Sequence, residues 1–152
     1  MKNTLFLLCE DVTVDSKTNQ WTFIKHIEKM NLVVPAEKRA EEQNLSVKGK
    51  FNLTSFWKGE GGEEIELKYL LVDPAGDVLM DTPGYKLQIK DGVAIAKHRL
   101  VLGQIPIKSS GRYHFKLYKR EKGSYEEEAE IGVEVAIKES QEQTPEGEKK
   151  EE

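Results

Sequence analysis

Residues 111–138 read GRYHFKLYKREKGSYEEEAEIGVEVAIK, and the alternation of apolar and polar side chains in this stretch decides the fold class. A polar turn around Lys122, Gly123 and Ser124 divides it into two arms. The apolar residues of the two arms match across the turn: Tyr113, Phe115 and Leu117 on one side, and Ile131, Val133, Val135 and Ile137 on the other. Because side chains alternate between the two faces of a strand, this pattern predicts a closing β-hairpin with one buried face.

Similar alternation recurs along almost the whole chain and predicts an all-β protein. Further strands are expected at residues 5–14, 21–27, 30–34, 45–57, 64–72, 78–80, 85–89 and 93–102. Turn-forming residues separate several of them: Asp15–Asn19, Asp73-Pro74-Ala75-Gly76 and Asp91-Gly92. Gly49 interrupts the apolar face of residues 45–57, which indicates a bulge, and Pro35 ends the third strand because it cannot donate to a ladder. The two faces of residues 93–102 differ too little to orient that strand.

Eight or nine short strands, with turn signals about every 8–12 residues, predict a two-sheet antiparallel β-sandwich. The pattern Gly111-x-Tyr113-x-Phe115 is similar to the tyrosine-corner region of immunoglobulin-like domains, so we expect an immunoglobulin-like sandwich. A closed barrel is the alternative. The unequal strand lengths and the large inward residues favour the sandwich, because sheets that face each other about 10 Å apart need large side chains between them.

Composition restricts the class of protein further. The chain has 152 residues, of which 38% are hydrophobic and 33% charged, and its net charge is −4, so we expect one soluble domain with a charged surface. Acidic and basic residues are interspersed, which argues against a nucleic-acid partner. The 21 Glu and 19 Lys, against 6 Gln, 3 His and 1 Cys, are compatible with a thermophilic source.

Two features indicate a cytoplasmic protein with no membrane partner. Cys9 is the single cysteine, so no internal disulfide can form, which fits a reducing compartment. The apolar run from Leu5 to Cys9 is too short for a secretory leader, and no run approaches the length of a membrane-spanning helix.

The domain organisation follows from a change in composition near the C-terminus. Residues 1–138 are expected to form the β-sandwich domain. Residues 139–152 contain only Glu, Ser, Gln, Thr, Pro, Gly and Lys, so we expect a disordered acidic tail there. Residues 36–43 have helix-forming composition but no apolar face, and we interpret them as a surface loop with at most one helical turn.

The N-terminal sequence Leu5-Phe6-Leu7-Leu8-Cys9-Glu10-Asp11-Val12, followed by a polar turn and the strand Trp21-Thr22-Phe23-Ile24, resembles the opening of an uncharacterised family of small bacterial β-sandwich proteins. The hairpin around Val72-Asp73-Pro74-x-Gly76 and the strand Gly111-x-Tyr113-x-Phe115 are similar to that family too. The resemblance spans about residues 5–137. It implies the fold and a soluble intracellular protein, and it implies no reaction, because the family is a domain of unknown function.

The residues with reactive or metal-binding side chains do not form a motif. Cys9 continues the apolar face of the first strand and is expected in the core. The histidines His26, His98 and His114 lack ligand spacing, so we interpret them as surface or hydrogen-bonded residues, with His114 facing solvent. Glu10 and Asp11 are adjacent in a strand, so their carboxylates should diverge. We therefore expect no catalytic, cofactor-binding or metal-binding site, and no cofactor.

The loop Gly59-Glu60-Gly61-Gly62-Glu63-Glu64 is interpreted as structural, because it lacks the Lys-Ser/Thr of a phosphate loop and the spacing of an EF-hand. Phe56 and Trp57 are adjacent and must face opposite sides of a strand, so one of them lies outside the core. Leu70 and Val72 raise the same question on another strand. We predict a candidate interaction patch from four residues: Phe56, Trp57, Leu70 and Val72.

The sequence therefore favours a non-enzymatic protein that binds a partner protein or a second copy of itself, as an adaptor or structural module. Strand addition at a sheet edge or packing of an apolar face would be the mechanism. One alternative is a small-ligand or carbohydrate-binding module that uses exposed tryptophan. Another is a metal-dependent hydrolase, which would need the three histidines to gather at one site.

Overall fold

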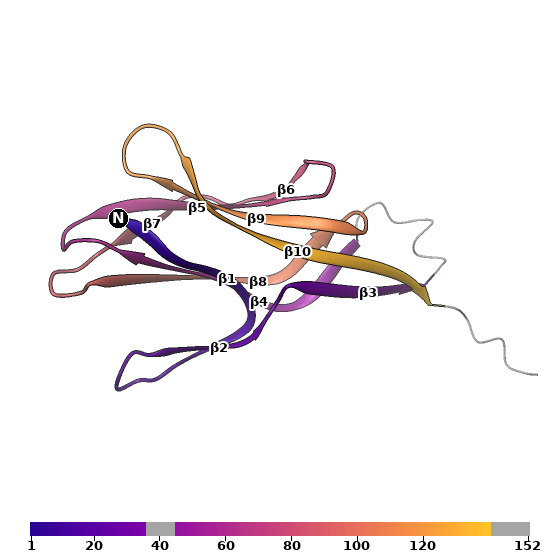
Figure 1. Ribbon diagram of the computed structural model, residues 1–152, viewed down its shortest axis with the longest axis horizontal. Coiled ribbons are helices and arrows are strands. Elements are labelled where there is room, and N and C mark those ends of the chain that lie inside the picture. The colour runs from indigo at the N-terminus through magenta and orange to yellow at the C-terminus, as the bar shows by residue number, and fades with distance from the viewer. Residues whose placement is uncertain (36–44, 141–152) are drawn as a thin grey trace, which may run out of the picture.

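The computed structural model describes residues 1–35 and 45–140, which form two packed β-sheets (Figure 1). Ten strands make up this part of the chain: β1 (Lys2–Val14), β2 (Trp21–His26), β3 (Lys29–Pro35), β4 (Leu45–Lys58), β5 (Glu64–Val72), β6 (Val78–Asp81), β7 (Tyr85–Gln88), β8 (Ile95–Ile107), β9 (Gly111–Arg120) and β10 (Glu126–Ser140). The described residues include no helix long and apolar enough to cross a membrane. The prediction of an all-β protein with two packed sheets is confirmed.

Sheet A contains four strands in the order β2-β1-β4-β8, and every neighbouring pair is antiparallel. β1 pairs with β4 through its first half and with β2 through its second half, so the β1–β2 hairpin extends away from the body of the sheet (Figure 1). The register of β4 against β8 shifts between Lys48 and Phe51, which places one extra residue on β4. The bulge that Gly49 predicted is therefore present.

Sheet B has the order β3-β10-β9-β5-β6, and β7 pairs with β5 beyond the end of β6. Two details of the prediction are wrong here. The described strands number ten rather than eight or nine, because every predicted stretch, including the short ones that form β6 and β7, is a separate strand. The sheets are also not purely antiparallel, because the chain crosses from β2 into sheet B and lays β3 parallel to β10.

The closing hairpin β9–β10 has the predicted register, with Phe115 opposite Ile131 and Tyr113 opposite Val133. Its inward side chains join those of β5 and β4 in one core between the sheets. The largest fully buried side chains are Trp57, Tyr69, Tyr113, Phe115, Leu8, Leu53, Leu67, Leu71, Ile89, Ile105, Ile107 and Leu117. Burial of this much apolar surface is the main force that holds the two sheets together.

The hydroxyl of Tyr113 fixes the corner between β8 and β9. It accepts hydrogen bonds from the backbone N–H groups of Lys108 (2.9 Å) and Ser109 (3.1 Å), and it donates to the carbonyl of Ser109 (2.8 Å). A tyrosine whose hydroxyl bonds the backbone a few residues upstream is the local arrangement that the Gly111-x-Tyr113-x-Phe115 pattern predicted.

Several strand boundaries extend beyond the predicted ones. β1 begins at Lys2, β3 includes Pro35, and β8 continues to Ile107, where the sequence pattern ended at Leu102. β10 runs to Ser140, two residues past the predicted end of the domain. The predicted loop at residues 36–43 and residues 141–152 of the predicted tail lie outside the described residues.

Candidate functional site

The edge of sheet A formed by β8 is the longest edge strand in the described part of the chain. β8 has 13 residues, against 6 in β2 and 7 in β3 at the other sheet edges. β8 pairs with β4 on one side, and no described strand pairs with its other side. An edge strand of this length presents a row of backbone hydrogen-bonding groups that another chain can use.

The hydrogen bonds of sheet A show which residues of β8 direct their backbone groups outward. The carbonyl of Leu8 accepts from the N–H of Ile27, so the backbone of Leu8 faces away from β4. Leu53 lies opposite Leu8 and therefore faces β8, where its partner is Leu100. Because backbone direction alternates along a strand, His98, Leu100 and Leu102 bond β4. The intervening Lys97, Arg99 and Val101 direct their N–H and C=O groups to the free edge.

The outer face of β8 carries exposed apolar side chains beside two cations. Ile95 is 43% and Val101 47% exposed, and Lys97 and Arg99 lie between them. Lys97 Nζ donates to the carbonyl of Asn19 (2.7 Å), and Arg99 Nη1 donates to the carbonyl of Val12 (3.4 Å). Neither cation has a carboxylate within 4 Å among the described residues. Both therefore keep unused N–H donors at the edge.

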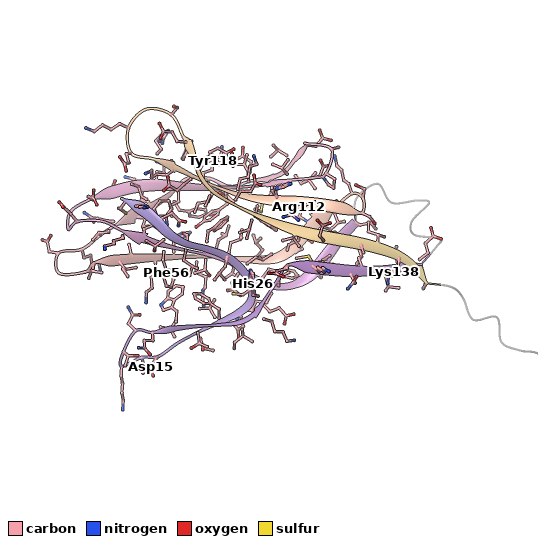
Figure 2. All side chains as sticks on the ribbon, viewed as in Figure 1. Asp15, His26, Phe56, Arg112, Tyr118 and Lys138 are labelled. Atoms are coloured by element: carbon pink, nitrogen blue, oxygen red, sulfur yellow. The ribbon has the colours of Figure 1, made fainter. Side chains whose placement is uncertain are left out.

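Three aromatic rings cluster on the outer face of sheet A, and two of them contact Lys97. Phe56 of β4 packs against Trp21 and Phe23 of β2, with ring centroids 5.6 and 5.7 Å apart. Lys97 Nζ lies 5.5 Å from the Trp21 ring centroid and 5.2 Å from that of Phe56, a cation–π arrangement. Figure 2 shows Phe56 between the body of sheet A and the β1–β2 hairpin, with Asp15 at the hairpin tip.

The inner side of the β8 edge is a partly open apolar seam. Leu100 and Leu102 of β8 are half-buried and pack on the core, and so do Leu79 and Met80 of β6. β6 and β7 form the edge of sheet B on this side, and β7 lies close to the start of β8 without pairing with it. A segment added to β8 would therefore cover apolar side chains on its inner face.

A chain of hydrogen bonds crosses the core behind the edge. Trp57 Nε1 donates to Ser55 Oγ (2.9 Å), Ser55 Oγ shares a hydrogen bond with the hydroxyl of Tyr69 (3.1 Å), and that hydroxyl lies 2.7 Å from His98 Nδ1. The rings of Tyr69 and His98 stack, with centroids 5.6 Å apart, and Tyr85 packs against both. This chain connects β4 and β8 of sheet A to β5 of sheet B.

The chemistry of this chain is structural. Burial raises the pKa of the Tyr69 hydroxyl, so Tyr69 remains a neutral hydrogen-bonding group. Burial also lowers the pKa of His98, which favours the neutral imidazole. Ser55 is fully buried, so no substrate reaches its hydroxyl in this conformation. No sequence motif links residues of three different strands, so the hydrogen-bond chain was not predicted.

The three histidines lie in different surroundings, and each has a different partner. His98 is half-buried and hydrogen-bonded to Tyr69, whereas His114 Nδ1 lies 2.8 Å from Glu130 and the exposed His26 lies 3.7 Å from Glu28. His114 is on the outer face of sheet B, as predicted, at a side-chain exposure of 30%. No group of three or more metal-binding side chains gathers within residues 1–35 and 45–140.

Cys9 is fully buried, as predicted, and its Sγ lies 3.3 Å from the carbonyl of Asp11. Burial, and next the charge of Asp11, raises the pKa of this thiol, which disfavours the reactive thiolate. Glu10 and Asp11 diverge, because Glu10 pairs with Lys25 (3.1 Å) and Asp11 with Lys50 (3.3 Å). Hydrogen bonding to the N–H of Val12, together with Lys50, lowers the pKa of Asp11.

The four residues of the predicted patch are not brought together. Trp57 is fully buried, and Phe56 is half-buried among the rings of β2, so the expected division between the two neighbours is present. Leu70 and Val72 are half-buried on the other sheet, beside Lys116 and His114 of β9. Phe56 and Trp57 both lie opposite β8, at Lys97 and Ala96, but only Phe56 is on the outer face of sheet A.

The glycine-rich loop and one pocket are two further features with polar side chains close together. In the glycine-rich loop, the Glu63 carboxylate accepts from the N–H of Glu60 (2.7 Å), so it closes the turn. A pocket of about 530 Å³ lies between the sheets near the β4 bulge, and Met30, Phe51, Lys29 and Lys48 are among its lining residues. Glu10 and Asp11, which also line it, are ion-paired with Lys25 and Lys50.

Comparison of the sequence with protein-family models and with curated proteins finds no match. The resemblance to a family of small bacterial β-sandwich proteins therefore stays a prediction.

Proposed function

We propose that this protein is a non-enzymatic binding module that takes an extended segment of a partner protein onto the free edge of β8. The observation that carries the proposal is the outward direction of the backbone groups of Lys97, Arg99 and Val101 on a strand of 13 residues. Strand addition at such an edge gains affinity from main-chain hydrogen bonds and specificity from alternate side chains.

The side chains around this edge support the same function. Ile95 and Val101 expose apolar surface on one face, and the seam at Leu100 and Leu102 exposes it on the other. An incoming strand would bury apolar area on both faces while it completes the ladder of sheet A. A second copy of this chain is the alternative occupant.

We also propose that the sandwich is immunoglobulin-like and that the protein is cytoplasmic. The order β1-β4-β8 in one sheet and β10-β9-β5 in the other corresponds to the A-B-E and G-F-C strands of that fold, and the Tyr113 corner supports the assignment. The single buried thiol of Cys9 is compatible with a reducing compartment.

Proline at Val101 tests the proposed binding mode. Proline removes the outward N–H at this position and leaves the bonds between β8 and β4 in place. Peptides of 12 residues would be selected from an unbiased display library on the full chain, and each would be titrated against V101P and V101A. We expect V101P to abolish binding and V101A, which keeps the N–H, to retain most of it. Equal binding to both variants would refute strand addition at β8.

A second pair of variants and a check of the fold separate loss of the N–H from a folding defect. Arg99 also directs its N–H outward, so Arg99→Pro is compared with Arg99→Ala in the same titration. Near-ultraviolet circular dichroism of the buried Trp57 reports whether each variant keeps the native core.

A further inference from the structure

We propose that the segment bound at β8 alternates acidic and apolar residues, with its carboxylates on the outer face beside Lys97 and Arg99. The inference rests on the proposed strand addition and specifies the chemistry of the partner. It follows from how this chain neutralises its own basic strands.

Residues 92–120 contain no aspartate or glutamate, although the whole chain has 27 acidic residues. Seven cations fall in this stretch: Lys97, Arg99, Lys108, Arg112, Lys116, Lys119 and Arg120. It comprises β8, β9 and the corner between them, so both strands are basic and lack carboxylates of their own.

On β9 the neighbouring strands supply the missing carboxylates. Arg112 pairs with Glu134 (3.0 Å) and Lys116 with Glu130 (3.5 Å), both from β10 on one side. Arg120 pairs with Glu66 (2.8 Å) from β5 on the other side. Both neighbours alternate acidic and apolar residues, as in Glu64-Ile65-Glu66-Leu67, with the apolar ones in the core. Figure 2 labels Arg112 and Tyr118 near the two ends of β9.

On β8 the residues that the structure describes supply no corresponding carboxylate. Its one neighbour, β4, has the sequence LSVKGKFNLTSFWK, which contains no acidic residue. Among residues 1–35 and 45–140, Lys97 and Arg99 donate to the backbone carbonyls of Asn19 and Val12 and to no carboxylate. Asp11 lies near enough for Arg99 to contribute to its lowered pKa, but its ion-pair partner is Lys50. β8 is thus a basic strand like β9, but the acidic strands that flank β9 have no counterpart on the open side of β8.

The two faces of β8 determine which residue types should alternate along the bound segment. Side chains of an added strand point in turn to the outer face, beside Lys97 and Arg99, and to the inner face, beside Leu100 and Leu102. Carboxylates complement the first set and apolar side chains the second. A second copy of β8 supplies no carboxylate, which disfavours the homodimer as the occupant.

The composition of the selected peptides tests the inference directly. We expect the peptides whose binding V101P abolishes to carry Asp or Glu at every second position with apolar residues between them. Arg99→Glu should weaken these peptides about 3- to 30-fold, because one attractive cross-strand pair becomes repulsive. Peptides in which the facing Glu is replaced by Lys should recover binding to R99E. Lys122→Glu, in the distant β9–β10 turn, makes the same change in net charge and should have no effect.

The outcomes separate this inference from the proposed function. Peptides that need the N–H of residue 101 but have no acidic bias, and that bind R99E as well as the unaltered chain, would overturn the acidic partner and leave strand addition intact. Peptides that bind V101P normally, or no enrichment of any peptide, would overturn both. Concentration-dependent self-association that V101P abolishes, with no peptide binding, would assign the edge to a second copy and overturn the acidic partner.

Discussion

Replacement of Tyr69 by phenylalanine tests the role of the hydrogen-bond chain that crosses the core. The Tyr69 hydroxyl lies 3.1 Å from Ser55 Oγ and 2.7 Å from His98 Nδ1, so its removal leaves each of these groups one partner short. Ser55 is fully buried, and an unsatisfied buried group costs about 1–3 kcal/mol, whereas half-buried His98 loses about 1 kcal/mol. We therefore expect Y69F to lower the free energy of unfolding by about 2–4 kcal/mol.

Tyr85→Phe is the matched control for Y69F. Tyr85 packs against the same two rings, with centroids 6.2 Å from Tyr69 and 5.1 Å from His98, and its hydroxyl has no partner among the described residues. We expect Y85F to stay within about 0.5 kcal/mol of the unaltered protein. Urea unfolding followed by tryptophan fluorescence measures both variants, and Y69F should also lower the Tm by about 5–10 °C. Equal loss in the two variants would refute a structural role for the hydrogen-bond chain.

Three further predictions follow from burial and protonation. Trp57→Ala should lower the free energy of unfolding in urea by about 3–5 kcal/mol and Phe56→Ala by about 1–2 kcal/mol, because only Trp57 lies wholly in the core. Similar losses in the two variants would contradict the assignment of Trp57 to the inner face and Phe56 to the outer face of β4. Burial lowers the pKa of His98 in the folded protein, so as pH falls the unfolded chain binds the proton first, and the free energy of unfolding should fall below about pH 6.5. Urea unfolding of His98→Asn should depend less on pH over that range. An unchanged pH profile in this variant would count against the effect. Cys9 should react with a thiol reagent about 100-fold more slowly, or slower still, in the native protein than in urea, because burial both blocks access and raises the pKa of the thiol; equal rates would place Cys9 at the surface.

The alternation of apolar and polar residues within each strand predicted most of the side chains that point into the core. The hairpin from Gly111 to Lys138 has the expected register, and Ile65, Leu67, Tyr69 and Leu71 all lie in the core. Phe56 and Trp57 lie on opposite sides of β4, as adjacent strand residues must. These results depend on side-chain direction within one strand, which the order of residues determines.

Partner choice between distant strands could not be derived in this way. The two faces of β8 have similar polarity in the sequence because Ile95 and Val101 are exposed at a sheet edge, where an apolar residue need not be buried. The parallel pairing of β3 with β10 depends on where the chain crosses between sheets. The acid-free run of residues 92–120 was visible in the sequence, but it indicates an unmatched edge only once β9 has been placed between two acidic strands.

Amide hydrogen exchange along β8, resolved by residue with NMR on the full chain, tests the central claim most directly. If the edge is free, the amides of His98, Leu100 and Leu102 are bonded to β4, and those of Lys97, Arg99 and Val101 are open to water. We expect the first three to exchange at least ~100-fold more slowly than the second three. Uniform protection of all six amides would show that another segment already covers the edge, and it would contradict the account.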